Sequence, residues 1–172
     1  MYDENTHHRI TLIRHAKSSW SDPRPADFDR PLNKRGKRDA PRVGRYLAEA
    51  GIDFDLVLCS QASRARKTLR GLRTELAIDD HHIEYRQDLY LASSTTIKSI
   101  IAECPSEKRD VAVIAHNPGL ENLAWDFSNR SVDRMPTCCV VRFSFENSVD
   151  SWEQGISGDG KVELYLLARN LE

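Results

Sequence analysis

The order of apolar and polar positions predicts a chain in which strands and helices alternate. Compact apolar runs at 9–15, 55–60 and 111–115 are typical of buried strands, and a shorter strand is expected at 82–85. Two further β-rich runs, at 138–145 and 161–168, are joined by a loop that contains glycine. Strands separated by helices favour a parallel sheet, and the last two strands favour antiparallel pairing.

Apolar residues return at helical spacing between these strands. In the clearest helix, 62–77, they fall at i, i+4, i+7 and i+11: Ala65, Leu69, Leu72 and Leu76. Capping signals predict three further helices: from Asn33 to about Ala50, from Ser94 or Thr95 to Pro105, and from Pro118 onward. The pattern predicts an α/β fold, a three-layer αβα sandwich with a mainly parallel sheet and helices on both faces.

Length and composition place these elements in one soluble domain. The chain has 172 residues, the usual size of a single domain, so we expect one domain over 1–172. Lys and Arg total 25 and Asp and Glu 26, a balance that argues against a nucleic-acid coat protein. The apolar runs are far shorter than the ~20 residues that span a bilayer, and residues 1–9 do not resemble a signal peptide. We therefore expect a cytoplasmic protein without membrane contact.

Cysteine and histidine spacing does not indicate a metal site. The four cysteines include no CxxC motif, so we expect neither a disulfide framework nor a zinc site, and we place them as small core residues. The pairs His7-His8 and His81-His82 have no evident third ligand, and we expect both on solvated surface. No metal or other cofactor is expected.

Basic residues are concentrated in two segments. Between Arg30 and Arg45 there are seven basic residues and one acid, and between Arg64 and Arg73 there are five and none. Such segregation can attract an anion to one side of a molecule without net charge, although solvated helix faces would show the same pattern. We interpret Arg66, Arg70 and Arg73, at i, i+4 and i+7, as a solvated stripe.

Three predicted strands end in residues suited to a phosphoryl group. The first ends at Arg14-His15, the second leads to Arg64 at a helix start, and the fourth leads to His116. Ligands bind at the carboxyl ends of strands in such folds, and guanidinium groups and helix N-termini both favour phosphate. Two nearby guanidinium groups also lower the pKa of an imidazole, which keeps it neutral and nucleophilic.

The same residues carry a family resemblance. The motifs are 13–20 (IRHAKSSW), Pro31-Leu32-Asn33-x-x-Gly36, Ser60-x-x-x-Arg64-Ala65-x-x-Thr68 and His116-Asn117-Pro118. In this order they resemble the histidine phosphatase (phosphoglycerate-mutase-like) superfamily and, within it, the small SixA-like phosphohistidine phosphatases. Ala16, where the mutase branch has glycine, fits the SixA-like branch. The resemblance covers roughly residues 9–127 and implies a phosphoglycerate-mutase-like fold.

The resemblance also implies roles for individual residues. His15 is the residue phosphorylated during turnover, and Arg14, Arg64 and His116 hold the phosphoryl group. Ser18 matches a phosphate-contacting position and Lys17 could steer an anionic substrate, although a loop hydroxyl and a solvated charge are equally compatible with the sequence. Mutases carry a glutamate as general acid after the third strand. Asp88 is the nearest carboxylate here, and its alternative role is to cap or solvate the loop.

These observations predict a metal-independent phosphatase that acts through phospho-His15, with protein phosphohistidine as the substrate. Three alternatives stay open: a phosphatase of a small phosphorylated metabolite, a mutase, and a non-catalytic phosphate- or RNA-binding module that uses the two basic segments. The near-zero net charge makes nucleic acid the less favoured partner.

Overall fold

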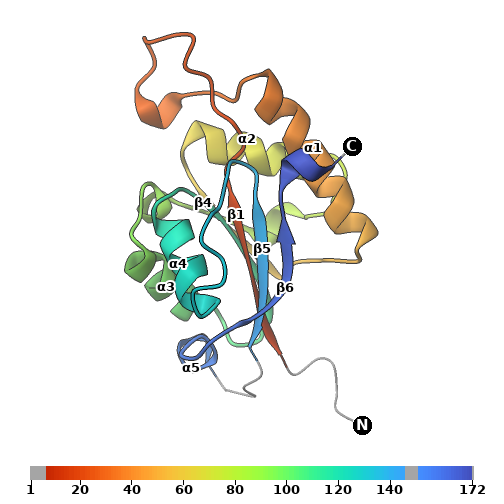
Figure 1. Ribbon diagram of the computed structural model, residues 1–172, viewed down its shortest axis with the longest axis vertical. Coiled ribbons are helices and arrows are strands. Elements are labelled where there is room, and N and C mark those ends of the chain that lie inside the picture. Colours follow the sequence, from red (N-terminus) through yellow and green to blue (C-terminus); the bar gives the residue numbers. More distant parts are fainter. Residues whose placement is uncertain (1–6, 146–150, 172) are drawn as a thin grey trace.

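The computed structural model describes residues 7–145 and 151–171, and within these ranges a six-stranded sheet forms the centre of the molecule (Figure 1). The strands are β1 (His8–Arg14), β2 (Leu56–Ser60), β3 (Ile83–Arg86), β4 (Asp110–Ala115), β5 (Val140–Phe145) and β6 (Lys161–Leu166). The α-helices are α1 (Lys34–Glu49), α2 (Ser63–Leu72), α3 (Ser94–Ala102), α4 (Gly119–Phe127) and α5 (Trp152–Gly155). All the predicted strands and helices are therefore present, with small differences in their bounds.

The sheet has the order β3-β2-β4-β1-β5-β6. The first four strands in this order are parallel, with β1 beside β4 and β2 between β4 and β3. β5 is antiparallel to both β1 and β6. The prediction of a mainly parallel sheet with antiparallel pairing near the end is confirmed. This order places the carboxyl ends of β1, β2 and β4 side by side.

Helices cover both faces of the sheet, as predicted. Side chains of a strand point alternately to the two faces. On β4, Val111 and Val113 join the core formed with α3 and α4, whereas Ala112 and Ile114 join the core formed with α1 and α2. Figure 1 shows α3 and α4 on one side of the sheet and α1 on the other, and the buried side chains of α2 belong to the same core as those of α1. The fold is the three-layer αβα sandwich.

α2 ends earlier than the predicted boundary of residue 77. The helix stops at Leu72, and the Thr74 hydroxyl donates to the Gly71 carbonyl at 2.8 Å. A side chain that bonds the nearby backbone competes with the helical ladder, and glycine weakens that ladder further. Leu76 is nevertheless buried, which explains why the apolar periodicity continues beyond the helix.

One predicted surface residue is in fact buried. His8 is fully buried and packs edge-on against Trp152 of α5, with ring centroids 4.5 Å apart. The expectation of a solvated His7-His8 pair is therefore wrong for His8. Spacing along the chain could not show this, because the covering ring lies far away in sequence.

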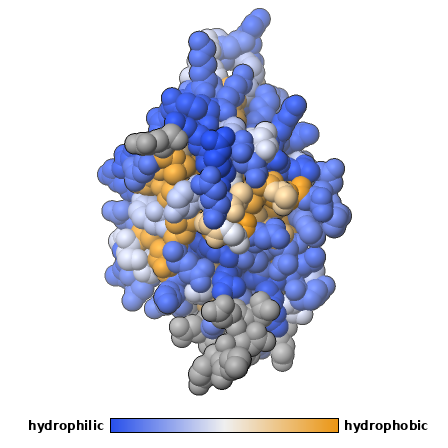
Figure 2. All heavy atoms as spheres, turned by 90° about the vertical axis from the view of Figure 1, so that its right-hand side faces the viewer, coloured by the Kyte–Doolittle hydropathy of each residue, from blue (hydrophilic) through white to orange (hydrophobic). Residues whose placement is uncertain are grey.

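The face on which α1 and β6 lie carries apolar surface across its middle, between hydrophilic regions (Figure 2). β6 is an edge strand, and its Tyr165 side chain is exposed. Among the described residues, no helix is long and apolar enough to cross a bilayer.

Candidate active site

The structure brings together the four residues that the sequence placed at strand ends. Arg14 is the last residue of β1 and His15 follows it, Arg64 lies in the first turn of α2, and His116 follows β4. Arg64 Nε donates to His15 Nε2 at 3.3 Å, and the rings of His15 and His116 lie 5.1 Å apart between centroids. His15, Arg64 and His116 are buried, and Arg14 is partly buried.

Hydrogen bonding fixes which nitrogen of His15 carries a proton. Nδ1 lies 2.8 Å from the Ala16 carbonyl oxygen, which can only accept, so Nδ1 is the N–H group. Nε2 therefore holds the lone pair and accepts from Arg64. The pKa of His15 is lowered to about 4, first by burial and then by the positive charges of Arg64 and Arg14. His15 is a neutral imidazole at neutral pH with its nucleophilic nitrogen at the Arg64 guanidinium.

His116 is held by Ser60 from the neighbouring strand. Its Nε2 lies 2.8 Å from Ser60 Oγ. Burial, followed by the neighbouring His15 ring and the positive charge of Arg64, lowers the pKa of His116 to about 3, so His116 is also neutral. Its Nδ1 is buried and has no hydrogen-bond partner among the described residues.

Arg14 also has a buried side-chain nitrogen that lacks a hydrogen-bond partner in the described part of the chain. NH1 of Arg14 donates to the Met135 carbonyl at 2.9 Å, whereas its buried Nε has no partner within the described ranges. A buried polar group left without a partner costs about 1–3 kcal/mol. Arg14 and His116 flank His15, and each has one such group. Together these groups suit a ligand with several acceptor oxygens.

Two residues that the sequence analysis did not place in the site contact Arg64. Asp27 accepts from Arg64 NH1 through its carbonyl at 2.7 Å and from NH2 through Oδ2 at 3.1 Å. The Tyr90 hydroxyl donates to the same Oδ2 at 2.6 Å, and this bond, followed by the charge of Arg64, lowers the pKa of Asp27. The Tyr90 ring also lies edge-on to His116, 5.5 Å between centroids. In this state the backbone carbonyl and the carboxylate of Asp27 occupy the two terminal nitrogens of Arg64, and an incoming anion must compete with them.

Several motif residues hold the segment that follows His15 in place. The Thr68 hydroxyl donates to the Arg64 carbonyl at 2.7 Å and accepts from the Ala16 amide at 2.8 Å, which ties α2 to the segment after β1. Asn33 caps α1 by accepting from Gly36 N at 2.9 Å, and Asn33 N donates to the Lys17 carbonyl. A Cβ at Gly36 would lie 2.3 Å from the Lys17 carbonyl oxygen, so only glycine lets α1 approach this segment.

The other candidate residues lie at different places. Lys17 is exposed and Ser18 is buried beside Leu32, to which it forms an isolated bridge. Both carboxylate oxygens of Asp88 accept from Arg86, at 3.0 and 2.7 Å, and this bonding lowers the pKa of Asp88. No hydrogen bond joins Asp88 to the four clamp residues Arg14, His15, Arg64 and His116 in the described part of the chain. The role of Asp88 as general acid stays a prediction. Its ion pair with Arg86 argues against that role, because it favours the ionised carboxylate.

Donor atoms of a third residue lie near His81 and His82. Asp79, His81 and His82 have ligand atoms within 4.8 Å of one another, so a third potential ligand that was not evident from the sequence lies beside this histidine pair. His81 and Asp79 are exposed and His82 is half-buried. Close acidic and imidazole groups at a surface are common without a metal, and the triplet comes from one short segment.

Comparison with known proteins agrees with this geometry. Residues 10–90 match the histidine phosphatase superfamily (branch 1). The chain belongs to the histidine phosphatase superfamily. It is 30% identical over 167 residues to an uncharacterised chloroplastic protein of Arabidopsis thaliana. This match covers 91% of the present chain and 75% of the Arabidopsis protein.

Solved structures of this superfamily share the fold. A candidate phosphohistidine phosphatase SixA of Agrobacterium tumefaciens is 27% identical, with a TM-score of 0.78 over 93% of this chain and 97% of that one. The protein histidine phosphatase SixA complexed with tungstate is 19% identical, with a TM-score of 0.80 over 95% and 99% of the two chains. The phosphoglycerate-mutase-like fold and the SixA-like resemblance are confirmed.

Proposed function

We propose that this protein is a phosphatase that works through a covalent phosphohistidine on His15 and hydrolyses protein phosphohistidine. The observation that carries the proposal is the state of His15. Its Nδ1–H is fixed by the Ala16 carbonyl, and its Nε2 lone pair faces a guanidinium group. A neutral imidazole so oriented is a nucleophile towards phosphorus.

The first step transfers the phosphoryl group to the enzyme. The Arg64 Nε–H turns from His15 Nε2 to a phosphoryl oxygen, and the lone pair of Nε2 forms a bond to phosphorus. The other ring nitrogen of the substrate imidazole carries a proton taken from solvent. The bond between phosphorus and the substrate imidazole breaks, its electron pair stays on the nitrogen that held phosphorus, and the imidazole leaves as a neutral ring. Arg14, Arg64 and His116 donate to the equatorial oxygens, where the transition state carries its charge.

The second step regenerates the enzyme. A water oxygen forms a bond to phosphorus, the Nε2–phosphorus bond breaks, and its electron pair returns to Nε2 of His15. The water proton leaves with orthophosphate or to solvent. Because Nδ1 keeps its proton and its bond to the Ala16 carbonyl, the imidazole returns to its starting tautomer.

The carboxylates of Asp27, which contacts Arg64, and of Asp88, the candidate acid, favour a leaving group that needs no strong acid. Asp27 and Asp88 are both held by cationic partners, and both have a lowered pKa, so both are ionised at neutral pH. An alkyl phosphate leaves as an alkoxide and needs a proton donor, whereas an imidazole leaving group is far less basic. Similarity to proteins named SixA points to the same substrate.

The test compares kcat/KM on three substrates: a phosphohistidine-bearing protein domain, nitrophenyl phosphate and an alkyl phosphate such as 3-phosphoglycerate. We expect the phosphohistidine domain to exceed the alkyl phosphate by ~10²-fold or more. His15→Ala should abolish all three reactions.

A higher kcat/KM on a metabolite would overturn the protein substrate and favour the metabolite phosphatase. Conversion of 3-phosphoglycerate to an isomer would indicate a mutase. Absence of any turnover, with salt-sensitive RNA binding that survives His15→Ala, would favour the binding module.

A further inference from the structure

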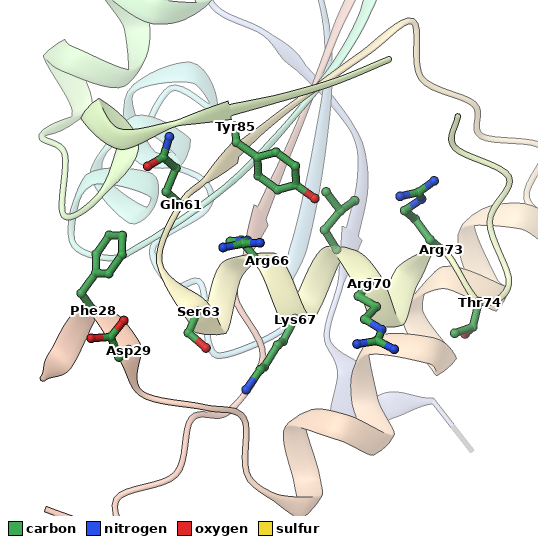
Figure 3. A pocket seen from close by; sticks show the side chains of 11 residues that line it. Phe28, Asp29, Gln61, Ser63, Arg66, Lys67, Arg70, Arg73, Thr74 and Tyr85 are labelled. Carbon is green, nitrogen blue, oxygen red and sulfur yellow. The ribbon is translucent and has the colours of Figure 1, made fainter. Parts of the chain in front are cut away.

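A basic groove runs along α2 and begins beside the active site. Figure 3 shows its lining, and its volume is about 730 Å³. Phe28, Asp29, Gln61 and Ser63 line the end of the groove next to Asp27 and Arg64. The groove therefore lies where the part of a substrate beyond its phosphoryl group would extend.

Four basic side chains, three from α2 and one from its C-cap residue Arg73, line the groove. Arg66, Lys67 and Arg70 are exposed and Arg73 is half-buried. Arg73 pairs with Asp80 at 2.7 Å, whereas no ion pair neutralises Lys67 or Arg70 among the described residues. The stripe that the sequence analysis interpreted as solvated surface thus forms one wall of a concave, positively charged surface.

The opposite wall is aromatic. Tyr85 of β3 lines the groove, and the Arg66 guanidinium lies 5.5 Å from the centroid of its ring. Phe28, at the active-site end, packs edge-on against Tyr90 with centroids 5.0 Å apart. These two rings add apolar contact surface to a groove whose other wall is basic.

The dimensions suit a short extended peptide. From Ser63 to Arg73 a helix rises about 15 Å, at 1.5 Å per residue, and an extended chain covers that distance in about five residues. Acidic side chains spaced along such a segment would meet Lys67 and Arg70, whose charges are not neutralised within the described chain. The net charge of the whole protein is only −1, so the basic character is local.

We propose that this groove binds an acidic segment of the phosphorylated protein substrate, within about five residues of the phosphohistidine. This inference rests on the proposed function, since it specifies which phosphoproteins the site takes. Complementary charge raises the rate of encounter and selects among partners more than it adds affinity. Preference among substrates should therefore appear in kcat/KM.

The experiment uses two phosphohistidine peptides that differ only in their flanking residues. One carries Asp and Glu on both sides of the phosphohistidine and the other carries Asn and Gln. The measured quantity is the ratio of kcat/KM for the acidic peptide to that for the neutral one. It is compared in the wild type, in the double variant Lys67→Glu/Arg70→Glu, and in the control Lys161→Glu, which reverses an exposed charge on β6 at the far edge of the sheet.

We expect a ratio of roughly ten in the wild type and in Lys161→Glu, and a ratio of one or less in the double variant, since each exposed ion pair contributes modestly. The wild-type ratio should fall towards one when the ionic strength rises from about 0.05 M to about 0.5 M, because salt screens exposed charges. A wild-type ratio near one, or a ratio unchanged in the double variant, would overturn the proposal. Far-ultraviolet circular dichroism checks that all variants are folded.

A binding measurement separates failure of the groove from failure of the phosphatase. If neither peptide is hydrolysed, the proposed function fails, and the groove is judged by fluorescence anisotropy of the labelled, unphosphorylated acidic peptide. Binding that weakens about tenfold in the double variant but not in Lys161→Glu supports the groove. No binding, or stronger binding of a single-stranded RNA oligonucleotide that the double variant loses, overturns the acidic peptide as its occupant.

Discussion

Burial of His15 in its neutral form makes stability depend on pH. The pKa of His15 is about 4 in the folded protein and ~6.5 in an unfolded chain. Below about pH 6.5 the unfolded state therefore binds a proton that the folded state does not, and stability falls as the pH drops towards 4. Between pH 7 and pH 5 this linkage removes about 2 kcal/mol from the free energy of unfolding.

The prediction is measured by urea unfolding at pH 7 and pH 5, for the wild type and for His15→Asn. Asparagine does not titrate, and its side-chain amide can still donate towards the Ala16 carbonyl that Nδ1 contacts. Contributions from other groups cancel in the difference between the two proteins. The wild type should lose about 2 kcal/mol more than the variant on acidification. Equal losses, or a greater loss in the variant, would refute the conclusion that His15 is buried and neutral.

Three further predictions concern the surroundings of the nucleophile. Activity should persist in excess EDTA, because the clamp contains no carboxylate and because Arg64 and Tyr90 already bind the Asp27 carboxylate. Loss of activity with rescue by Mg²⁺ or Zn²⁺ would contradict this. Asp88→Asn should change the hydrolysis rate of alkyl phosphates by less than about threefold, because Arg86 holds both carboxylate oxygens of Asp88. A ~10²-fold loss confined to alkyl phosphates would instead make Asp88 the proton donor. Gly36→Ala should lower the free energy of unfolding by about 1–3 kcal/mol, because the new Cβ clashes with the Lys17 carbonyl. Gly158→Ala is the matched control, since a Cβ at that position meets no atom within 4 Å. Equal effects of the two substitutions in urea unfolding would show that the clash does not lower stability.

The sheet and its helices could be predicted because their apolar periodicity is local. Each face of β4 is encoded in six consecutive residues, and the alternation of strands and helices then limits the topology. The four clamp residues could be predicted for the same reason, since each adjoins the carboxyl end of a strand or begins a helix.

Other features depend on contacts between distant segments. Asp27 reaches Arg64 from a 3-10 turn, 37 residues away along the chain, and no spacing rule fixes where that turn lies. His8 is covered by Trp152 of α5, which is distant in the sequence. The apolar periodicity continues to Leu76 and does not reveal that the helical hydrogen bonds of α2 stop earlier. The basic stripe of α2 could be read from the sequence, but only the position of Tyr85 on β3 shows that it lines a groove.

The central claim is that the phosphoryl group passes through His15 Nε2. It is tested by incubating the protein with labelled phosphoramidate, quenching in alkali and locating the label by peptide mapping. The account predicts a label on residue 15 that survives alkali, is released by acid because protonation makes the P–N nitrogen a good leaving group, and is absent from His15→Ala. An acid-stable label, or a label on serine or cysteine, would contradict it.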